Sequence, residues 1–266
     1  GFYFLKYVLD YNLNELPNIL NFIFFIVNFY TIDNGTSYLF FLVFLWSISI
    51  EEQFYIFWAF FLKYFFKYLK QLSFILIFIS LIFRAYYAIV EPVNNILYFH
   101  TFSAFGNFGV GSLLALMSFK KTNIFNKIKS FTFFKSSTIY LLFLFSLIFY
   151  NNIFSNSYFV IFERLFYSLI FGYIIIEQAF NNRAKIQFGK SKSLSFLGKI
   201  SYGLYIYHGV VITLLVYILN AFSIKDSIIF TIIIYPIIIL LATSFIANFS
   251  YKYIELWFLK MKKKYY

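Results

Sequence analysis

A ten-residue string carries the densest polar chemistry in this sequence. It runs from Trp46 to Tyr55, reads Trp-Ser-Ile-Ser-Ile-Glu-Glu-Gln-Phe-Tyr, and lies inside the apolar stretch 38–62. A charged side chain at the centre of a membrane helix costs roughly 2.5–3.5 kcal/mol on insertion scales. Two adjacent carboxylates and an amide are therefore expected to face protein, water or a ligand. Because these groups suit proton transfer and hydrogen bonding, the string predicts a functional site.

In a helix, the polar side chains of this string divide between two sides. One arc of about 120° holds four of them: Trp46, Ser49, Glu52 and Gln53. Glu51 lies about 100° from Glu52, on the side of Tyr55. We predict that Glu52 faces a polar cavity and that Glu51 pairs with another helix. The alternative, that both carboxylates are buried partners that position helices, stays open.

Composition places the rest of the chain in a membrane. The 266 residues are 62% hydrophobic and 12% charged, whereas soluble domains average about 45–50% apolar and about 25% charged residues. The apolar residues form runs of about 17–25, the length that spans a bilayer core. The absence of cysteine excludes disulfides, thiolate metal ligands and a cysteine nucleophile. We expect neither a metal nor a bound cofactor.

We therefore predict an all-α, polytopic membrane bundle that forms a single domain over residues 1–266. About eight spans are expected: 16–31, 38–62, 72–90, 97–119, 135–151, 158–180, 197–219 and 227–250. Pro236 lies inside the last of these and should kink it. A cluster of small residues in the fourth span predicts close helix packing: Gly106, Gly109, Gly111, Ser112 and Ala115.

Basic residues alternate between the connecting loops. One set of loops is basic: 63–70, 120–135, 183–199 and 252–264. The other set holds a single base: the loops near Asp33, Glu91, Asn151 and Lys225–Asp226. The positive-inside rule places the basic loops and the C-terminus in the cytoplasm. We expect the membrane to be a bacterial cytoplasmic (inner) membrane. The net charge of +12 then reflects topology and anionic lipid headgroups, and bases split among four loops argue against nucleic-acid binding.

Three further polar residues within the spans are candidate site residues. Arg84 requires a carboxylate of the string, or a phosphate or thioester oxygen of a bound donor, as its partner. Tyr205 and His208 share a helical face with Ser201. A neutral histidine can take a proton from a hydroxyl near neutral pH, or it can simply hydrogen-bond within the bundle.

The remaining ionisable groups in the spans have structural interpretations. His100 is expected to be a polar anchor near the outer interface. Glu163 and Arg164 point about 100° apart and are expected to reach other helices or headgroups rather than each other. Glu177, near a cytoplasmic helix end, is expected to extend to the interface and is given no role.

Four segments, in the same order, resemble the acyltransferase 3 family of integral membrane O-acyltransferases. Leu45–Trp58 is similar to the family's Trp-Ser-Leu-Ser-Val-Glu-Glu-Gln-Phe-Tyr string. Leu197–His208, Leu-Gly-Lys-Ile-Ser-Tyr-Gly-Leu-Tyr-Ile-Tyr-His, resembles its Leu-Gly-x-Ile-Ser-Tyr-x-Leu-Tyr-Leu-x-His helix. Tyr98–Ala115 resembles the Thr-x-x-Arg … Gly-x-Leu-Leu-Ala helix, and Ser250–Phe258 the closing Ser-x-x-x-x-Glu-x-Pro-Phe motif.

The resemblance implies transfer of an acyl group, often acetyl, from a cytoplasmic acyl-CoA co-substrate to hydroxyls of a cell-surface glycan or lipid-linked sugar. The expected partners are this donor, this acceptor and membrane lipids. We predict Glu52 and His208 as catalytic residues. The predicted substrate-binding residues are Trp46, Ser49, Glu51, Gln53, Tyr55, Arg84 and Tyr205.

The chain departs from the family pattern in three respects. It begins at Gly1, and nothing in it matches the first-helix His usually taken as the catalytic base, or an Arg-x-x-Arg segment. Ala104 stands where the family has an Arg, with Asn107 near its acidic position. Trp257 replaces the closing Pro. We therefore expect an N-terminally truncated domain that is inactive by itself.

Two other interpretations stay open. A transporter or flippase would use Glu51, Glu52 and Arg84 as a proton or ion relay, and predicts internal repeats and broken helices. A gene remnant would insert into the membrane without chemistry. An acyltransferase instead predicts that the glutamate helix, Arg84 and His208 converge on one cavity open to the cytoplasm.

Overall fold

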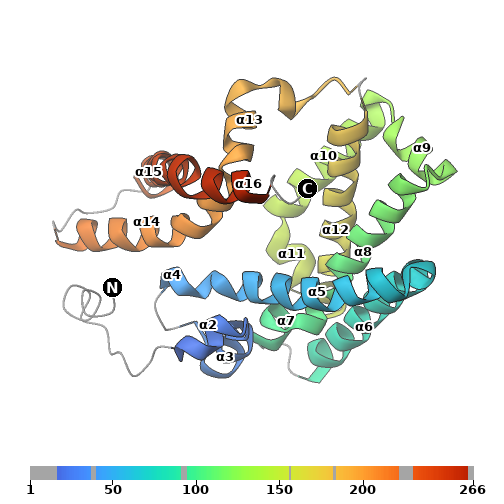
Figure 1. The fold of residues 1–266 in the computed structure, drawn as a ribbon, viewed down its shortest axis with the longest axis horizontal. Helices are drawn as coiled ribbons and strands as arrows, with labels where there is room; N and C mark the ends of the chain where they lie inside the picture. The colour runs from blue at the N-terminus through green and yellow to red at the C-terminus, as the bar shows by residue number, and fades with distance from the viewer. Residues whose placement is uncertain are drawn as a thin grey trace. The chain divides into compact units, whose positions relative to one another are not determined.

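A computed structural model describes residues 17–36, 40–90, 95–155, 157–181, 184–221 and 230–262. Within these ranges the chain is helical and contains no strand, which confirms the all-α class. The chain divides into two compact units, whose helices are labelled in Figure 1. The larger unit comprises Leu20–Gly35 and Trp46–Gln187, and the smaller comprises Gly1–Ile19, Thr36–Leu45 and Phe188–Tyr266.

The larger unit is built on three long helices, α6 (Leu69–Val90), α8 (Thr101–Phe119) and α12 (Ser157–Phe180). α6 packs on α8, and α12 packs on both (Figure 1). The other helical segments of this unit are α2 (Ile19–Ile23), α3 (Val27–Asn34), α5 (Leu45–Tyr64), η2 (Phe66–Tyr68), α7 (Asn95–Phe99), α9 (Asn123–Lys129), α10 (Phe133–Ile148) and α11 (Tyr150–Phe154).

The smaller unit pairs α14 (Ser201–Ala221) with α15 (Tyr235–Ser250). Pro236 is the second residue of α15, the helix that directly follows the π-helical turn η4 (Phe230–Ile234). Because proline cannot donate to the carbonyl four residues before it, regular α-helical pairing is interrupted at the predicted place. The remaining segments are α4 (Phe40–Val43), η3 (Phe188–Lys190), α13 (Lys192–Lys199), η5 (Tyr251–Glu255) and α16 (Leu256–Lys262).

The two faces of α6 show why this fold belongs in a membrane. Its buried residues recur every three or four positions and are largely small or polar: Leu69, Ser73, Leu76, Ser80, Arg84 and Ala88. Its exposed side chains are large and apolar: Phe74, Ile75, Phe78, Ile82, Tyr86 and Ile89. Polar groups directed inward and apolar groups outward are the arrangement that a hydrocarbon surrounding requires. The protein is therefore an integral membrane protein.

The expected count of about eight spans is not confirmed. Five described helices are long and apolar enough to cross a membrane, or six if α9 and α10, bent by 83°, form one span. The predicted span 16–31 is broken at Phe25, whose φ of 53° separates two helices too short to cross. α5 has 20 residues but is not among these five; its first half carries Glu51, Glu52 and Gln53, which lower its mean hydropathy. The start of the span 227–250 and the loops near Glu91 and Lys225–Asp226 lie outside the described residues.

Small residues bring α6 and α8 close together, as predicted. A Cβ atom on Gly109 would lie 2.7 Å from the carbonyl oxygen of Ser73, and one on Gly106 would lie 3.0 Å from the hydroxyl oxygen of Ser80. The hydroxyls of Ser73 and Ser112 are 2.7 Å apart across the same interface. Gly111 belongs to the same small-residue cluster but points elsewhere, because a Cβ atom there meets nothing within 4 Å.

This difference predicts that alanine substitutions at the two glycines change the stability of the protein differently. Gly109→Ala should destabilise the protein by about 1–3 kcal/mol, because the added methyl group meets the backbone of α6. Gly111→Ala should be neutral or stabilise by up to about 1 kcal/mol, since alanine favours the helix. Thermal unfolding in detergent checks both variants. Equal melting temperatures would contradict the close packing of α6 on α8.

Candidate functional site

The string Trp46–Tyr55, which we call the signature string, occupies the first half of α5. Whether the side that carries Ser49, Glu52 and Gln53 lines a polar reaction cavity stays a prediction, but protein covers part of it. Ser49 is buried, and Gln53 is half-buried. The Trp46 ring packs against the rings of Tyr98 and Phe99 from α7, with centroids 5.4 and 5.0 Å away. Aromatic contacts and hydrogen bonds therefore hold this side of α5 against the rest of the larger unit.

The two carboxylates of α5 differ in environment. Glu52 is half-buried, whereas Glu51 and Tyr55 are exposed. Within the described ranges, neither carboxylate makes an ion pair or a hydrogen bond, so the pairing expected for Glu51 is not found there. A carboxylate without a protein partner can accept a proton or a hydrogen bond from a ligand.

Gln53 is the centre of a polar network that joins α3, α5 and α8. Its Nε2 donates to the carbonyl oxygen of Phe25 at 2.5 Å and to Oδ1 of Asn28 at 3.0 Å. Its Oε1 accepts from the hydroxyl of Thr101 at 2.6 Å. Asn28 in turn donates to the carbonyl oxygen of Phe99 at 3.2 Å. The amide of Gln53 is thus largely committed to holding α5 in place.

Asn28 is a member of this site that the sequence analysis missed. Its side chain is fully buried, and its Nδ2 lies 3.1 Å from the hydroxyl oxygen of Thr101. Thr101 belongs to the segment Tyr98–Ala115, which resembles a family helix. An amide inside the apolar run 19–31 is the signal that would have found Asn28, because such a group needs partners in a membrane protein.

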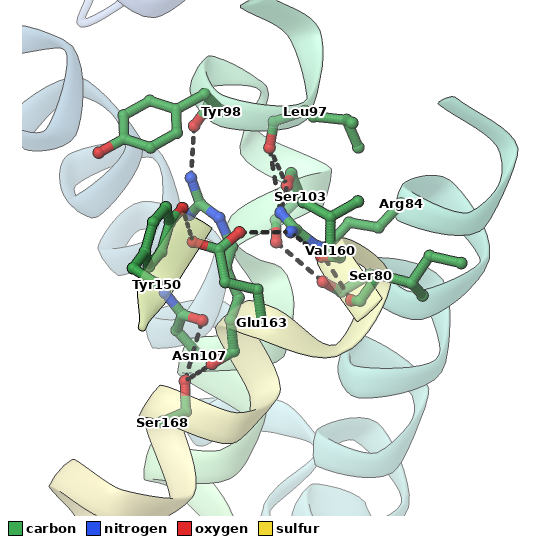
Figure 2. Close-up of polar contacts among 12 residues, drawn as sticks. Ser80, Arg84, Leu97, Tyr98, Ser103, Asn107, Tyr150, Val160, Glu163 and Ser168 are labelled. Carbon is green, nitrogen blue, oxygen red and sulfur yellow. Dashed lines mark hydrogen bonds and ion pairs between the residues drawn. The ribbon is translucent and has the colours of Figure 1, made fainter. Parts of the chain in front are cut away.

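Arg84 is held by a second network, which links α6, α7, α8 and α12 (Figure 2). Its guanidinium donates through Nε and both Nη atoms to the carbonyl oxygens of Leu97, Val160 and Ile161, the hydroxyl of Ser103 and the carboxylate of Glu163. The ion pair with Glu163 has an N–O distance of 3.0 Å, and the Arg84 side chain is only 2% exposed. These five hydrogen bonds match the five N–H groups of the guanidinium.

The partner of Arg84 is therefore Glu163, not a carboxylate of α5. Glu163 also accepts from the hydroxyl of Tyr150 at 2.7 Å, so it reaches other helices, as expected. A proton or ion relay that joins Arg84 to Glu51 and Glu52 is disfavoured by this pairing. A role for Arg84 in holding an anionic donor group stays a prediction.

A groove of about 870 Å³ runs along α8 and α12. We refer to it as the α8–α12 groove. Its polar lining residues are Tyr98, Asn107, Glu163, Arg164 and Ser168. Its large apolar lining residues are Leu114, Phe119, Phe171, Ile175, Ile176 and Phe180. Trp46 also lines it, which connects the signature string to a cavity of the size typical of ligand sites.

Tyr205 and His208 lie on α14, in the smaller unit. The hydroxyl of Tyr205 donates to the carbonyl oxygen of Phe44 at 2.8 Å. The imidazole of His208 packs on the Phe44 ring with centroids 4.2 Å apart, and its Nδ1 faces the carbonyl oxygen of Tyr205. The convergence of His208 with α5 and Arg84 on one cavity stays a prediction.

Two residues with structural interpretations have well-defined environments. Glu177 is buried and accepts from the hydroxyls of Tyr140 at 2.7 Å and Tyr173 at 3.2 Å. The expectation that it extends to the interface is wrong, because these two hydroxyls take the place of water. His100 caps α8 by accepting from the backbone N–H of Phe102 at 3.1 Å, which is an anchoring role.

No group of three His, Asp or Glu side chains suited to a metal occurs in the described part of the chain.

The fold and these networks define the class: a polytopic α-helical membrane protein with buried polar networks and two carboxylates on a largely apolar helix. Comparison with known proteins then identifies the family. The profile of the acyltransferase 3 family, described as an acyltransferase domain, matches residues 16–247. The chain belongs to this family of membrane acyltransferases. No curated protein and no solved structure matches it significantly.

The matched range also bears on domain organisation. It includes parts of both compact units, so the family domain extends across the division between them. The single domain expected over residues 1–266 stays a prediction.

Proposed function

We propose that the protein transfers an acyl group, most simply acetyl, from acyl-CoA to a hydroxyl of a cell-surface glycan or a lipid-linked sugar. The observation that carries the proposal is the position of Glu51 and Glu52. They lie on a largely apolar helix, in a chain that belongs to an acyltransferase family, and have no partner among the described residues. Carboxylates are costly on such a helix, and a reaction that needs them accounts for their presence.

Acyl transfer requires a group that removes the proton of the acceptor hydroxyl. The hydroxyl oxygen attacks the thioester carbonyl, a C–O bond forms, the C–S bond breaks, and the proton ends on the sulfur of the CoA thiol. Glu52 is our candidate for the group that takes and returns this proton, with His208 as a second proton acceptor. Gln53 and Ser49 would hold α5 in position, and Arg84 would hold α6, α8 and α12 together.

The other residues predicted to bind substrate would position the donor and the acceptor. Trp46 and Tyr55 would flank the substrates on either side of the glutamates, and Glu51 and Tyr205 would contact the acceptor. We also propose that the basic loops and the C-terminus face the cytoplasm of a bacterial inner membrane, because their charge distribution follows the positive-inside rule. The donor would then enter from the cytoplasm.

Membrane preparations test the proposal. Cells express the gene together with any coding sequence upstream of Gly1, and their membranes are incubated with radiolabelled acetyl-CoA. We expect alkali-labile label, as an ester, in the glycan or glycolipid fraction at levels well above those of vector-only membranes. A correctly inserted protein that yields no labelled ester in any fraction would contradict the proposed acetyl transfer.

A further inference from the structure

We propose that the α8–α12 groove binds an anionic membrane lipid. Its phosphate group would lie at Arg164, and one hydrocarbon chain would lie along the apolar part of the groove. This inference does not depend on acyl transfer, because none of its steps uses the glutamates of α5.

The first argument is an unbalanced positive charge at the polar end of the groove. Arg84 and Glu163 form an ion pair and neutralise each other. Arg164, beside them, has no carboxylate partner among the residues described. Its Nη2 donates to the carbonyl oxygen of Tyr98, and its guanidinium lies 5.5 Å from the centre of the Tyr98 ring. Its Nε and Nη1 have no acceptor in the described structure, so the guanidinium keeps donors for an anion.

The second argument is a polar pair that supplies further donors. The hydroxyl of Ser168 lies 2.9 Å from Oδ1 of Asn107 (Figure 2). It also lies 2.7 Å from the carbonyl oxygen of Arg164. The first contact uses the oxygen of the Asn107 amide, and no described residue accepts from its Nδ2. A guanidinium and an amide NH2 on one groove suit the oxygens of a phosphate, which accept several charge-assisted hydrogen bonds.

The third argument is the length and chemistry of the apolar wall. From Ser168 to Phe180, α12 advances about 18 Å at about 1.5 Å per residue. This length is close to one leaflet of a hydrocarbon core about 30 Å thick. Arg164 lies in the second turn of α12, six residues after the first residue of the span Tyr158–Phe180, so the apolar wall runs from there to the other end of the span. A small water-soluble anion would leave the apolar wall uncovered, whereas a lipid covers both parts.

The experiment measures lipid binding to the purified full chain in detergent, with phosphatidylglycerol as the anionic probe and phosphatidylcholine as the zwitterionic probe. Native mass spectrometry counts bound lipids, and a thermal-shift assay reports stabilisation. We expect a saturable phosphatidylglycerol site in the wild type and at least about tenfold weaker binding in Arg164→Gln, which loses the charge-assisted contacts. Arg164→Lys should retain part of the affinity.

A second variant tests the binding of the lipid's hydrocarbon chain without changing the charge of Arg164. Gly111 lines the groove and has open space around its Cβ position, so Gly111→Leu should fill the groove without disturbing the helix. We expect it to weaken phosphatidylglycerol binding while melting at the wild-type temperature or above in the absence of lipid. Lys70→Gln is the matched charge control, because Lys70 is exposed and makes no ion pair with a described residue. Its binding should equal that of the wild type.

Several outcomes would overturn the proposal. Equal binding of the two lipids, or wild-type binding by both Arg164→Gln and Gly111→Leu, would show that the groove holds no anionic lipid. Displacement of phosphatidylglycerol by an equal concentration of glycerol phosphate would reduce the site to a simple anion site. Glu52→Gln should bind phosphatidylglycerol like the wild type, so the failure of this proposal can be told apart from failure of the proposed acyl transfer.

Discussion

Replacing Arg84 with methionine should destabilise the larger unit by about 3–5 kcal/mol, as expected when one partner of a buried ion pair is removed. The substitution leaves the Glu163 carboxylate without its counter-ion. It also removes donors to the carbonyl oxygens of Leu97 and Ile161. In a membrane no water is at hand to replace these donors, and each unsatisfied group is costly.

Unfolding measured in detergent or in bicelles checks this expectation. Lys70→Met is the matched control on the same helix, because Lys70 is exposed and its change should stay within about 0.5 kcal/mol. Adding Glu163→Gln to Arg84→Met should recover part of the loss, since it removes the uncompensated charge. An Arg84→Met protein within about 1 kcal/mol of the wild type would show that this network does not hold the helices together.

Glu52→Gln should lower acyl transfer by at least about 100-fold, at the lower end of what general acid–base groups contribute. Glutamine keeps the shape and the hydrogen-bonding capacity of the side chain but cannot take a proton. Because Glu52 makes no ion pair with any residue in the described ranges, the substitution should leave insertion and melting temperature nearly unchanged. The radiolabelled acetyl-CoA assay, run on equal amounts of inserted protein, measures the effect.

Asp33→Asn is the matched control for this experiment. Asp33 is an exposed carboxylate on α3, outside the signature string, and the same chemical change there should leave transfer at the wild-type rate. If Glu52→Gln transfers acyl groups at the wild-type rate, Glu52 is not a catalytic residue, and His208 is the remaining candidate for the proton acceptor. A loss of transfer accompanied by a loss of folded protein would instead assign Glu52 a structural role.

The sequence alone was enough for the features that depend on local composition. Runs of apolar residues predicted helices in a membrane, because a bilayer offers no partner to an unpaired backbone group. The signature string led to the family that the profile match establishes. Gly106 and Gly109 predicted close helix packing, since side-chain size is a property of the residue itself. The helix projection also placed Ser49 and Gln53 on one side of α5, and the reaction cavity that this side was predicted to face stays a prediction.

The tertiary structure decided which groups meet. Arg84 pairs with a carboxylate 79 residues away on α12, Gln53 meets Asn28 on α3, and Glu177 is enclosed by tyrosine hydroxyls. Helical periodicity says which side chains share a face, but not which other helix covers that face. The groove at Arg164 depends on the same fact, because it forms only where α8 and α12 pack together. Pairings of this kind are set by how the whole bundle buries its polar groups away from lipid.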